Sequence, residues 1–298
     1  MSADGRFAPS PTGPLHLGSL RTALVAWLFA RSQSARFLLR IEDLDPQRSR
    51  REFERAQIAD LHRLGIDWDG EPVRQSERMA LYESALATLE AAGRLYPCFC
   101  TRAEIREAAS APHGDLPDGA YPGTCRALSP AERQDRKAAG RPFALRLRAD
   151  AERVTFQDRL LGSSNGVVDD FVVRRADGVP AYQLAVVVDD AAQGIGEVVR
   201  GVDLADSTPR QILLGRLLGL PIPTYAHVPL VLGADGTRLA KRHGAATLEQ
   251  RGEPVAETLA LLAHSLGLAA DRAAVMTAGE LLAEFDPGRI PRQPLTIG

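Results

Sequence analysis

The start of the chain sets a strand, a constrained loop and a helix in immediate succession. Residues 5–8 read as a short buried strand, and residues 8–19 have the sequence APSPTGPLHLGS. Three prolines fix φ in this stretch, while Gly13 and Gly18 allow the backbone to approach a ligand. Apolar residues then recur at helical spacing, which predicts a helix over residues 18–32. A helix N-terminus offers free backbone N–H groups, so this arrangement is typical of phosphate binding.

A second motif, RLAKR at residues 238–242, lies late in the chain and follows a turn at residues 234–236. Only two of the 36 basic residues are lysines, Lys137 and Lys241. A lysine at the centre of this motif is therefore not expected by chance. Lysine offers a mobile point charge that can meet negative charge developing on a transferring phosphoryl group. Together the two motifs indicate nucleotide chemistry.

The alternation of strands and helices predicts an α/β sheet with its site at the carboxyl ends of the strands. We expect a strand at 37–41, helices at 51–64 and 77–92, strand-like pieces at 143–147, 154–157 and 167–174, and a turn at 176–178. We further expect strand-like segments at 181–188 and 186–190, strands at 197–201 and 227–232, and a helix at 208–218. Capping boxes are expected at Thr101/Glu104, Ser129/Glu132 and Thr277/Glu280. The predicted division is 1–95 and 173–245 for two halves of a nucleotide-binding catalytic domain, 96–172 for an insertion between them, and 246–298 for a helical C-terminal segment.

Composition excludes some classes of function. The net charge of the 298 residues is −2, so binding to a nucleic acid would need a local basic surface. Arg126, Arg133 and Arg146, in and near the insertion, are the candidates for that surface. The chain has no run of eighteen apolar residues and no charged and apolar regions of a secretory signal at its start. We therefore expect no membrane contact and a cytoplasmic location.

The three cysteines, Cys98, Cys100 and Cys125, fall within 28 residues of one another. Their clustering favours a structural zinc site, because Zn²⁺ takes four N, O or S ligands. The fourth ligand could be His113, Asp115 or Tyr121. The alternative is three buried, reduced thiols without a metal.

The two motifs, in this order, resemble the HIGH and KMSKS signatures of class I aminoacyl-tRNA synthetases. The segments RFAPSPTG at 6–13 and RIEDLD at 40–45 resemble the glutamyl branch. The resemblance implies a Rossmann-like parallel sheet interrupted by a zinc-containing α+β insertion. It also implies that His16 and Lys241 are catalytic and that ATP is bound by His16, Gly18, Ser19, Arg238 and Lys241. Ser19 stands where the family usually has a second histidine, and Arg238, Ala240 and Arg242 replace a lysine and two serines.

The same resemblance implies a pocket for L-glutamate. Glu42 would meet the substrate ammonium group, and Arg200 would supply the selecting positive charge. The alternatives are that Glu42 is a capping acid or is paired with Arg40 or Arg48, and that Tyr182 and Arg200 are ordinary core and surface residues. The complete set implied for glutamate is Arg6, Phe7, Ala8, Pro9, Ser10, Glu42, Tyr182 and Arg200.

The spacing Cys-x-Cys followed by Tyr-x-x-x-Cys is similar to the glutamyl-queuosine branch of the family, which implies Tyr121 as the fourth zinc ligand. About fifty residues follow Lys241, where ordinary glutamyl-tRNA synthetases continue into an anticodon-binding region. This branch implies a monomer that activates glutamate with ATP and Mg²⁺ and modifies the queuosine base in the anticodon of tRNA(Asp). The alternatives are a compact synthetase charging tRNA(Glu) and an inactive paralogue that binds RNA or protein.

Overall fold

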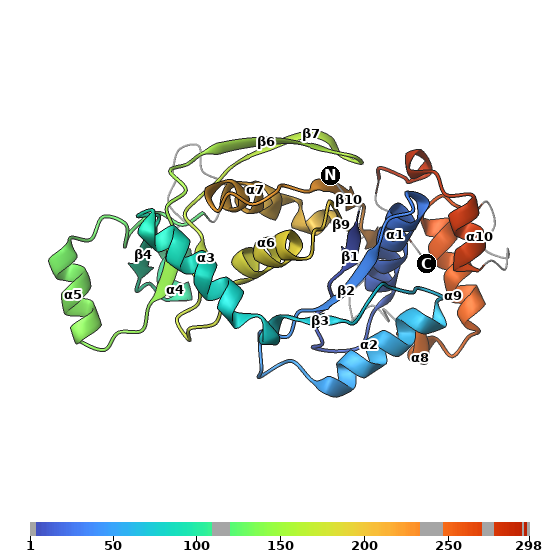
Figure 1. Ribbon diagram of the computed structural model, residues 1–298, viewed down its shortest axis with the longest axis horizontal. Helices are drawn as coiled ribbons and strands as arrows, with labels where there is room; N and C mark the ends of the chain where they lie inside the picture. Colours follow the sequence, from blue (N-terminus) through green and yellow to red (C-terminus); the bar gives the residue numbers. More distant parts are fainter. Residues whose placement is uncertain (1–3, 109–119, 233–246, 270–276, 294, 297–298) are drawn as a thin grey trace.

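The computed structural model describes residues 4–108, 120–232, 247–269, 277–293 and 295–296. Strands and helices alternate along most of the chain (Figure 1). The strands are β1 (Gly5–Phe7), β2 (Phe37–Ile41), β3 (Val73–Arg74), β4 (Leu95–Cys98), β5 (Ala144–Leu147), β6 (Arg153–Asp158), β7 (Gly162–Val167), β8 (Val172–Arg174), β9 (Glu197–Gly201), β10 (Thr224–Val228), β11 (Val231–Leu232) and β12 (Leu295–Thr296). The α-helices are α1 (Leu17–Ser32), α2 (Arg51–Arg63), α3 (Met79–Ala91), α4 (Arg102–Ala108), α5 (Pro130–Ala138), α6 (Tyr182–Ala192), α7 (Thr208–Leu217), α8 (Leu248–Arg251), α9 (Val255–Ser265) and α10 (Ala278–Ala283). The 3-10 helices are η1 (Gln75–Glu77), η2 (Val202–Ser207) and η4 (Pro287–Arg289).

The central sheet is parallel, as predicted. β1 pairs with β2 and β2 with β3, all in parallel, while β9, β10 and β6 form a second parallel set. The two sets meet where the backbone N–H groups of Gly196 and Glu197 donate to the carbonyl oxygen of Asp4, at 2.9 and 3.2 Å. Segments far apart in the sequence therefore lie side by side in one parallel arrangement of strands, as the α/β alternation predicts.

Helix α1 lies at the centre of the larger hydrophobic core. It is buried along nearly its whole length, because the sheet covers one side and α9 and α10 pack on the other (Figure 1). Gly5 in β1 permits close packing, since a Cβ atom there would lie 3.2 Å from the Cβ of Ala30. Arg21 fixes the C-terminal helices to this core by donating to the carbonyl oxygens of Pro229 and Ser265, at 2.6 and 3.1 Å.

A smaller antiparallel sheet, β4-β5-β8, lies away from the parallel sheet (Figure 1). It carries a separate core around the three cysteines. The hairpin β6–β7 comes from the predicted insertion, yet β6 pairs with β10 of the parallel sheet. Strand pairing therefore crosses the predicted boundary at 172, and the division into segments remains a prediction.

The expected strand-like segments at 181–188 and 186–190 are wrong, because these residues form helix α6. The run of three valines at 186–188 favours a strand by local preference. However, Leu184, Ala185 and Val188 follow helical spacing and are buried in another hydrophobic core, called here the second core, which α6 forms with residues of α3, α7, β9 and β10. Burial of that face therefore decides the conformation, as tertiary packing commonly overrides local preference. All three predicted capping boxes are present.

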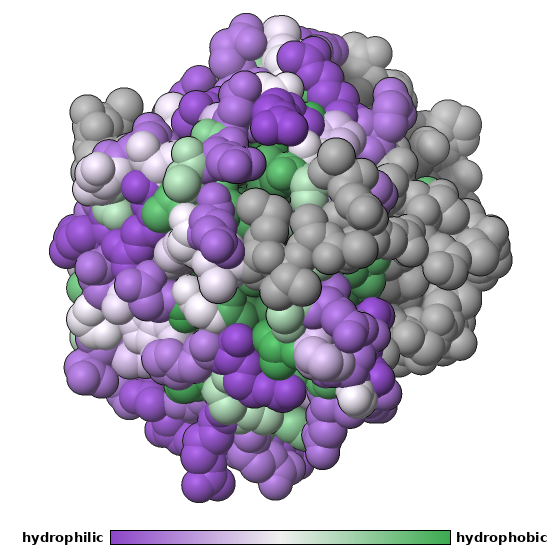
Figure 2. Space-filling view, turned by 90° about the vertical axis from the view of Figure 1, so that its right-hand side faces the viewer, coloured by the Kyte–Doolittle hydropathy of each residue, from purple (hydrophilic) through white to green (hydrophobic). Residues whose placement is uncertain are grey.

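Within the residues that the structure describes, no helix is both long and apolar enough to cross a membrane. On the face toward the right of Figure 1, where α9 and α10 lie, the described residues are mostly hydrophilic, and hydrophobic residues show between the polar ones (Figure 2).

Candidate active site

The loop between β1 and α1 is held by hydrogen bonds from residues outside it. The backbone N–H of Glu42 donates to the carbonyl oxygen of Pro9 at 2.9 Å, and the side-chain amide of Gln57 donates to the carbonyl oxygens of Ser10 and Gly13 at 3.1 and 2.7 Å. The loop ends at His16, which is the N-cap of α1 in an extended conformation. The N-terminus of α1 is thereby aimed into a cavity at the carboxyl ends of the strands.

This cavity has a volume of about 630 Å³. It brings together every predicted ATP and glutamate residue within the described part of the chain. Those residues are Arg6, Phe7, Ala8, Pro9, Ser10, His16, Gly18, Ser19, Glu42, Tyr182 and Arg200. Arg238 and Lys241 lie outside the described residues.

Arg200 is a buried cation in the wall of this cavity, with 4% of its surface exposed. Its Nε donates to His227 Nε2 at 3.1 Å, and its Nη2 donates to the Thr208 hydroxyl at 2.8 Å. Its Nη1 is buried and has no hydrogen-bond partner among the described residues. Burial lowers the pKa of Arg200. None of the described carboxylates forms an ion pair with it that would offset this effect. An anion placed against Nη1 would complete this guanidinium.

A buried charge network supports the floor of the cavity. Asp190 accepts from Arg6 Nε at 3.2 Å and from Arg40 Nη1 at 2.7 Å. Burial opposes the ionised form of Asp190, but Arg6 and Arg40 together lower its pKa. Asp189, the preceding residue, accepts from Arg78, Gln75 and Tyr82. The roles of both aspartates were not predicted from the sequence, because both were expected in a strand and lie in helix α6.

Glu42 lies between the network and the cavity. Arg40 Nη2 donates to it at a long 3.4 Å, so the alternative reading of Glu42 as an acid paired with Arg40 is in part correct. Burial raises the pKa of Glu42 despite Arg40 and Arg6. A largely buried carboxylate with weak pairing is suited to receive a second cation. Tyr182, at the first turn of α6, is 40% exposed and stands at the mouth of the cavity.

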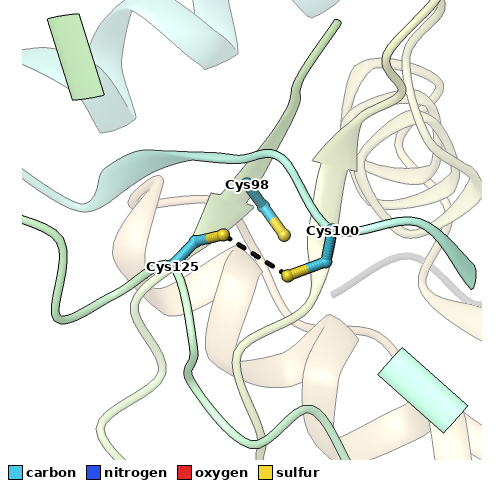
Figure 3. A group of neighbouring side chains, drawn as sticks. All are labelled: Cys98, Cys100 and Cys125. Carbon is cyan, nitrogen blue, oxygen red and sulfur yellow. Dashed lines mark hydrogen bonds between the residues drawn. The ribbon is translucent and has the colours of Figure 1, made fainter. Parts of the chain in front are cut away.

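The three cysteines meet as predicted. Their Sγ atoms lie within 4.8 Å of one another and are turned toward a common centre (Figure 3). The Tyr121 hydroxyl lies 3.4 Å from Cys98 Sγ and 3.6 Å from Cys100 Sγ. These three cysteines could hold a metal ion, and the phenol oxygen beside them gives a set of four S and O donors. His113 and Asp115, the other candidates for the fourth ligand, lie outside the described residues.

Surroundings of the cysteine cluster fit a site of concentrated negative charge. The Arg146 guanidinium lies 3.7 Å from the centre of the Tyr121 ring, a close cation–π contact. Without a metal, burial raises the pKa of the Cys100 thiol to about 12. Metal binding favours the thiolate, so an ion would offset that cost.

The expected basic surface of Arg126, Arg133 and Arg146 is not formed as predicted. Arg146 is buried, and its Nη1 donates to the carbonyl oxygen of Asp170 at 2.8 Å. Arg126 forms ion pairs with Asp150 and Asp170, and Arg133 donates to the carbonyl oxygen of Arg126. Arg146 is therefore not part of an exposed basic surface, and the two acids beside Arg126 offset its charge.

A second cavity of about 660 Å³ lies between the first cavity and the cysteine cluster. Ser10, Glu42 and Tyr182 line both cavities, and Cys98 and Cys100 line the far side of the second. We refer to Ser10, Glu42 and Tyr182 as the shared wall.

Comparison with known proteins gives a consistent result. Residues 3–289 match the sequence model of the catalytic domain of class I tRNA synthetases (E and Q). A glutamyl-Q tRNA(Asp) synthetase of Nocardia farcinica is 59% identical over 293 residues, which cover 97% of this chain and 91% of the relative. A protein of the same name from Symbiobacterium thermophilum is 52% identical, and the match covers 98% of this chain and 95% of the relative. The crystal structure of a glutamate tRNA ligase from Elizabethkingia meningosepticum, in complex with its amino acid, is similar with a TM-score of 0.85 at 28% identity, over all of this chain and 67% of that one.

Proposed function

Because the chain belongs to the family of class I tRNA synthetases for glutamate and glutamine, we propose that it activates L-glutamate with ATP and transfers the glutamyl group to the queuosine base in the anticodon of tRNA(Asp). Membership makes the protein an enzyme, a ligase of the class I aminoacyl-tRNA synthetases. Relatives named for the queuosine reaction match over more than nine-tenths of their own length, which favours that reaction over charging of tRNA(Glu).

The observation that carries the glutamate assignment is the buried Arg200 with its unpartnered Nη1. In the proposed complex, this N–H group receives the side-chain carboxylate of glutamate, and Glu42 receives the ammonium group. Glutamine lacks the negative charge that Arg200 would meet, so the pocket would discriminate between the two amino acids. Arg6, Ser10 and Tyr182 complete the pocket, with Phe7, Ala8 and Pro9 as its backbone edge.

ATP would occupy the other end of the cavity. The N-terminus of α1, with Gly18 and Ser19, faces the phosphates, and His16 lies beside them. The glutamate α-carboxylate attacks the α-phosphorus, and the bond to pyrophosphate breaks. Catalysis here is mostly positioning and stabilisation of spread negative charge. Mg²⁺ supplied with ATP would neutralise part of that charge, and we assign Lys241 and Arg238 to the same task.

The acceptor would approach through the second cavity. A hydroxyl of the queuosine cyclopentenediol attacks the carbonyl carbon of the glutamyl-adenylate, an ester bond forms, and AMP leaves while the hydroxyl proton passes to solvent. The shared wall would then be the boundary between the glutamyl-adenylate in the first cavity and the queuosine base in the second. No covalent intermediate with the protein is required.

We assign a single structural Zn²⁺ to Cys98, Cys100, Tyr121 and Cys125. The soft thiolates and the phenol oxygen of this set fit zinc, and four protein ligands are typical of a structural zinc site. When bound, the ion would connect the end of β4 to the loop at residue 125.

The test is pyrophosphate exchange followed by transfer. With glutamate and no tRNA, we expect exchange, which an inactive paralogue would not give. Radiolabelled glutamate should then label tRNA(Asp) from cells that make queuosine and not tRNA(Asp) from cells that lack it. Labelling of tRNA(Glu), or equal labelling of both tRNA(Asp) samples, would replace the queuosine reaction by ordinary charging.

A further inference from the structure

Behind Arg200, away from the cavity, lies a buried histidine–aspartate pair that the sequence analysis did not single out. His227 Nδ1 lies 2.5 Å from Asp158 Oδ2, and both side chains are fully buried. His227 and Arg200 are opposite one another in the parallel pairing of β10 with β9. Three elements, β6, β9 and β10, thus place Asp158, Arg200 and His227 in one line ending at the cavity.

The hydrogen bonds define which nitrogen of His227 carries the proton. Arg200 Nε can only donate, so His227 Nε2, at 3.1 Å, must accept and is unprotonated. The proton of the neutral ring is therefore on Nδ1 and is donated to Asp158. The Thr208 hydroxyl lies 3.2 Å from the same Nε2 and accepts from Arg200 Nη2 at 2.8 Å. Arg200 Nη2 also donates to the carbonyl oxygen of Leu204 at 3.3 Å, so within the described part of the chain Nη1 is the Arg200 nitrogen without a partner.

We propose that Asp158 and His227 are positioning residues for substrate selection: Asp158 holds His227 in the Nδ1–H tautomer, and His227 then holds Arg200 with Nη1 directed at the side-chain carboxylate of glutamate. This inference rests on the proposed function. Neither residue lines the cavity, so their effect on the substrate passes through Arg200.

Asp158→Asn tests the tautomer with little change of shape. The Asp158 Oδ1 atom accepts from the backbone N–H groups of Leu160 and Leu161, at 2.9 Å each, and an asparagine oxygen can keep these bonds. The asparagine NH₂ group then faces His227 Nδ1 as a donor. It favours the Nε2–H tautomer, which turns a donor toward the donor of Arg200.

We expect Asp158→Asn to raise the KM for glutamate about 10-fold to 100-fold in pyrophosphate exchange, since a hydrogen bond to a charged group is lost. The KM for ATP should stay within about twofold of the parent value, and the preference for glutamate over glutamine should fall. Glu197→Gln is the matched control. It makes the same change at a buried position on β9, where Glu197 contacts Arg159 and Gln33 and does not line the cavity.

Nitrogen-15 NMR of histidine-labelled protein provides a readout independent of activity. His227, assigned from the signal lost in His227→Gln, should show the Nδ1–H tautomer in the parent protein and the Nε2–H tautomer in Asp158→Asn. An Nε2–H signal in the parent protein would overturn the proposal even where the variant does not fold. An unchanged glutamate KM in folded Asp158→Asn, or equal increases in both KM values, would also overturn it. Absence of glutamate-dependent exchange in the parent protein, with the expected tautomer, would instead contradict the proposed function.

Discussion

Replacing Asp190 by asparagine removes the anion that links Arg6 to Arg40 beneath the cavity. Arg40 is fully buried and Arg6 nearly so, and both donate to Asp190. Breaking a buried ion pair by neutralising one partner generally costs about 3–5 kcal/mol, because the remaining charge is buried without compensation. Arg40 retains Glu42 at 3.4 Å and Asp189 at 3.8 Å, and asparagine keeps one oxygen acceptor. We therefore expect a loss near the lower end of that range, about 3 kcal/mol.

Urea unfolding followed by circular dichroism measures this loss as a lower midpoint with an unchanged slope. Asp177→Asn is the control, because Asp177 and its partner Arg175 are both about half exposed and such pairs contribute about 0–1 kcal/mol. The difference in free energy of unfolding between the parent protein and Asp190→Asn should decrease in acid. The pKa of Asp190 is lowered in the folded state, so its stabilisation is complete above the ordinary aspartate range and is lost as pH falls below it. A loss below about 1 kcal/mol at neutral pH, or a difference independent of pH, would refute this reasoning.

Three further perturbations test other parts of the molecule. Cys100→Ser should remove about one equivalent of zinc, measured by elemental analysis of protein purified without chelator, and metal-free, fully active parent protein would exclude the site. Gln57→Ala removes two hydrogen bonds to the loop, so the KM for ATP should rise several-fold and the free energy of unfolding should fall by about 1–3 kcal/mol. An ATP KM equal to that of the parent protein would show that the loop keeps its conformation without Gln57. Burial and the nearby charges of Arg200 and Arg6 lower the pKa of His227 in the folded protein, although Asp158 opposes them. Below a pH of about 6.5 the unfolded chain therefore binds the proton more readily than the folded protein, so the free energy of unfolding should fall as the pH drops. Thermal unfolding of parent protein and His227→Gln across pH 5–8 should show a smaller dependence in the variant.

Local patterns in the sequence predicted much of the fold. The loop at 8–16 and helix α1 could be predicted because prolines, glycines and helical spacing act within a few residues. Strand β2 and helix α2 end within one residue of their predicted limits for the same reason. Helix α6 could not be predicted in this way, because three consecutive valines carry a strand preference that only packing against the second core overrides.

Some residues of the candidate site could likewise be predicted from the sequence, and others could not. Arg6, Glu42 and Arg200 could be selected from a family resemblance, and the structure brings them to one cavity. Asp158 and His227 could not, because 69 residues separate them and neither lies in a recognisable motif. The prediction of an exposed Arg146 was wrong, and the sequence alone does not show that Asp150 and Asp170 pair with Arg126.

The shared wall of Ser10, Glu42 and Tyr182 has a thermodynamic consequence. A ligand in either cavity contacts side chains that also bound the other, so the two binding equilibria are coupled through the same three residues. Coupling free energies are reciprocal: if glutamate tightens RNA binding by some factor, RNA tightens glutamate binding by the same factor. A substitution in the wall that changes this factor must therefore change it equally for glutamate and for RNA.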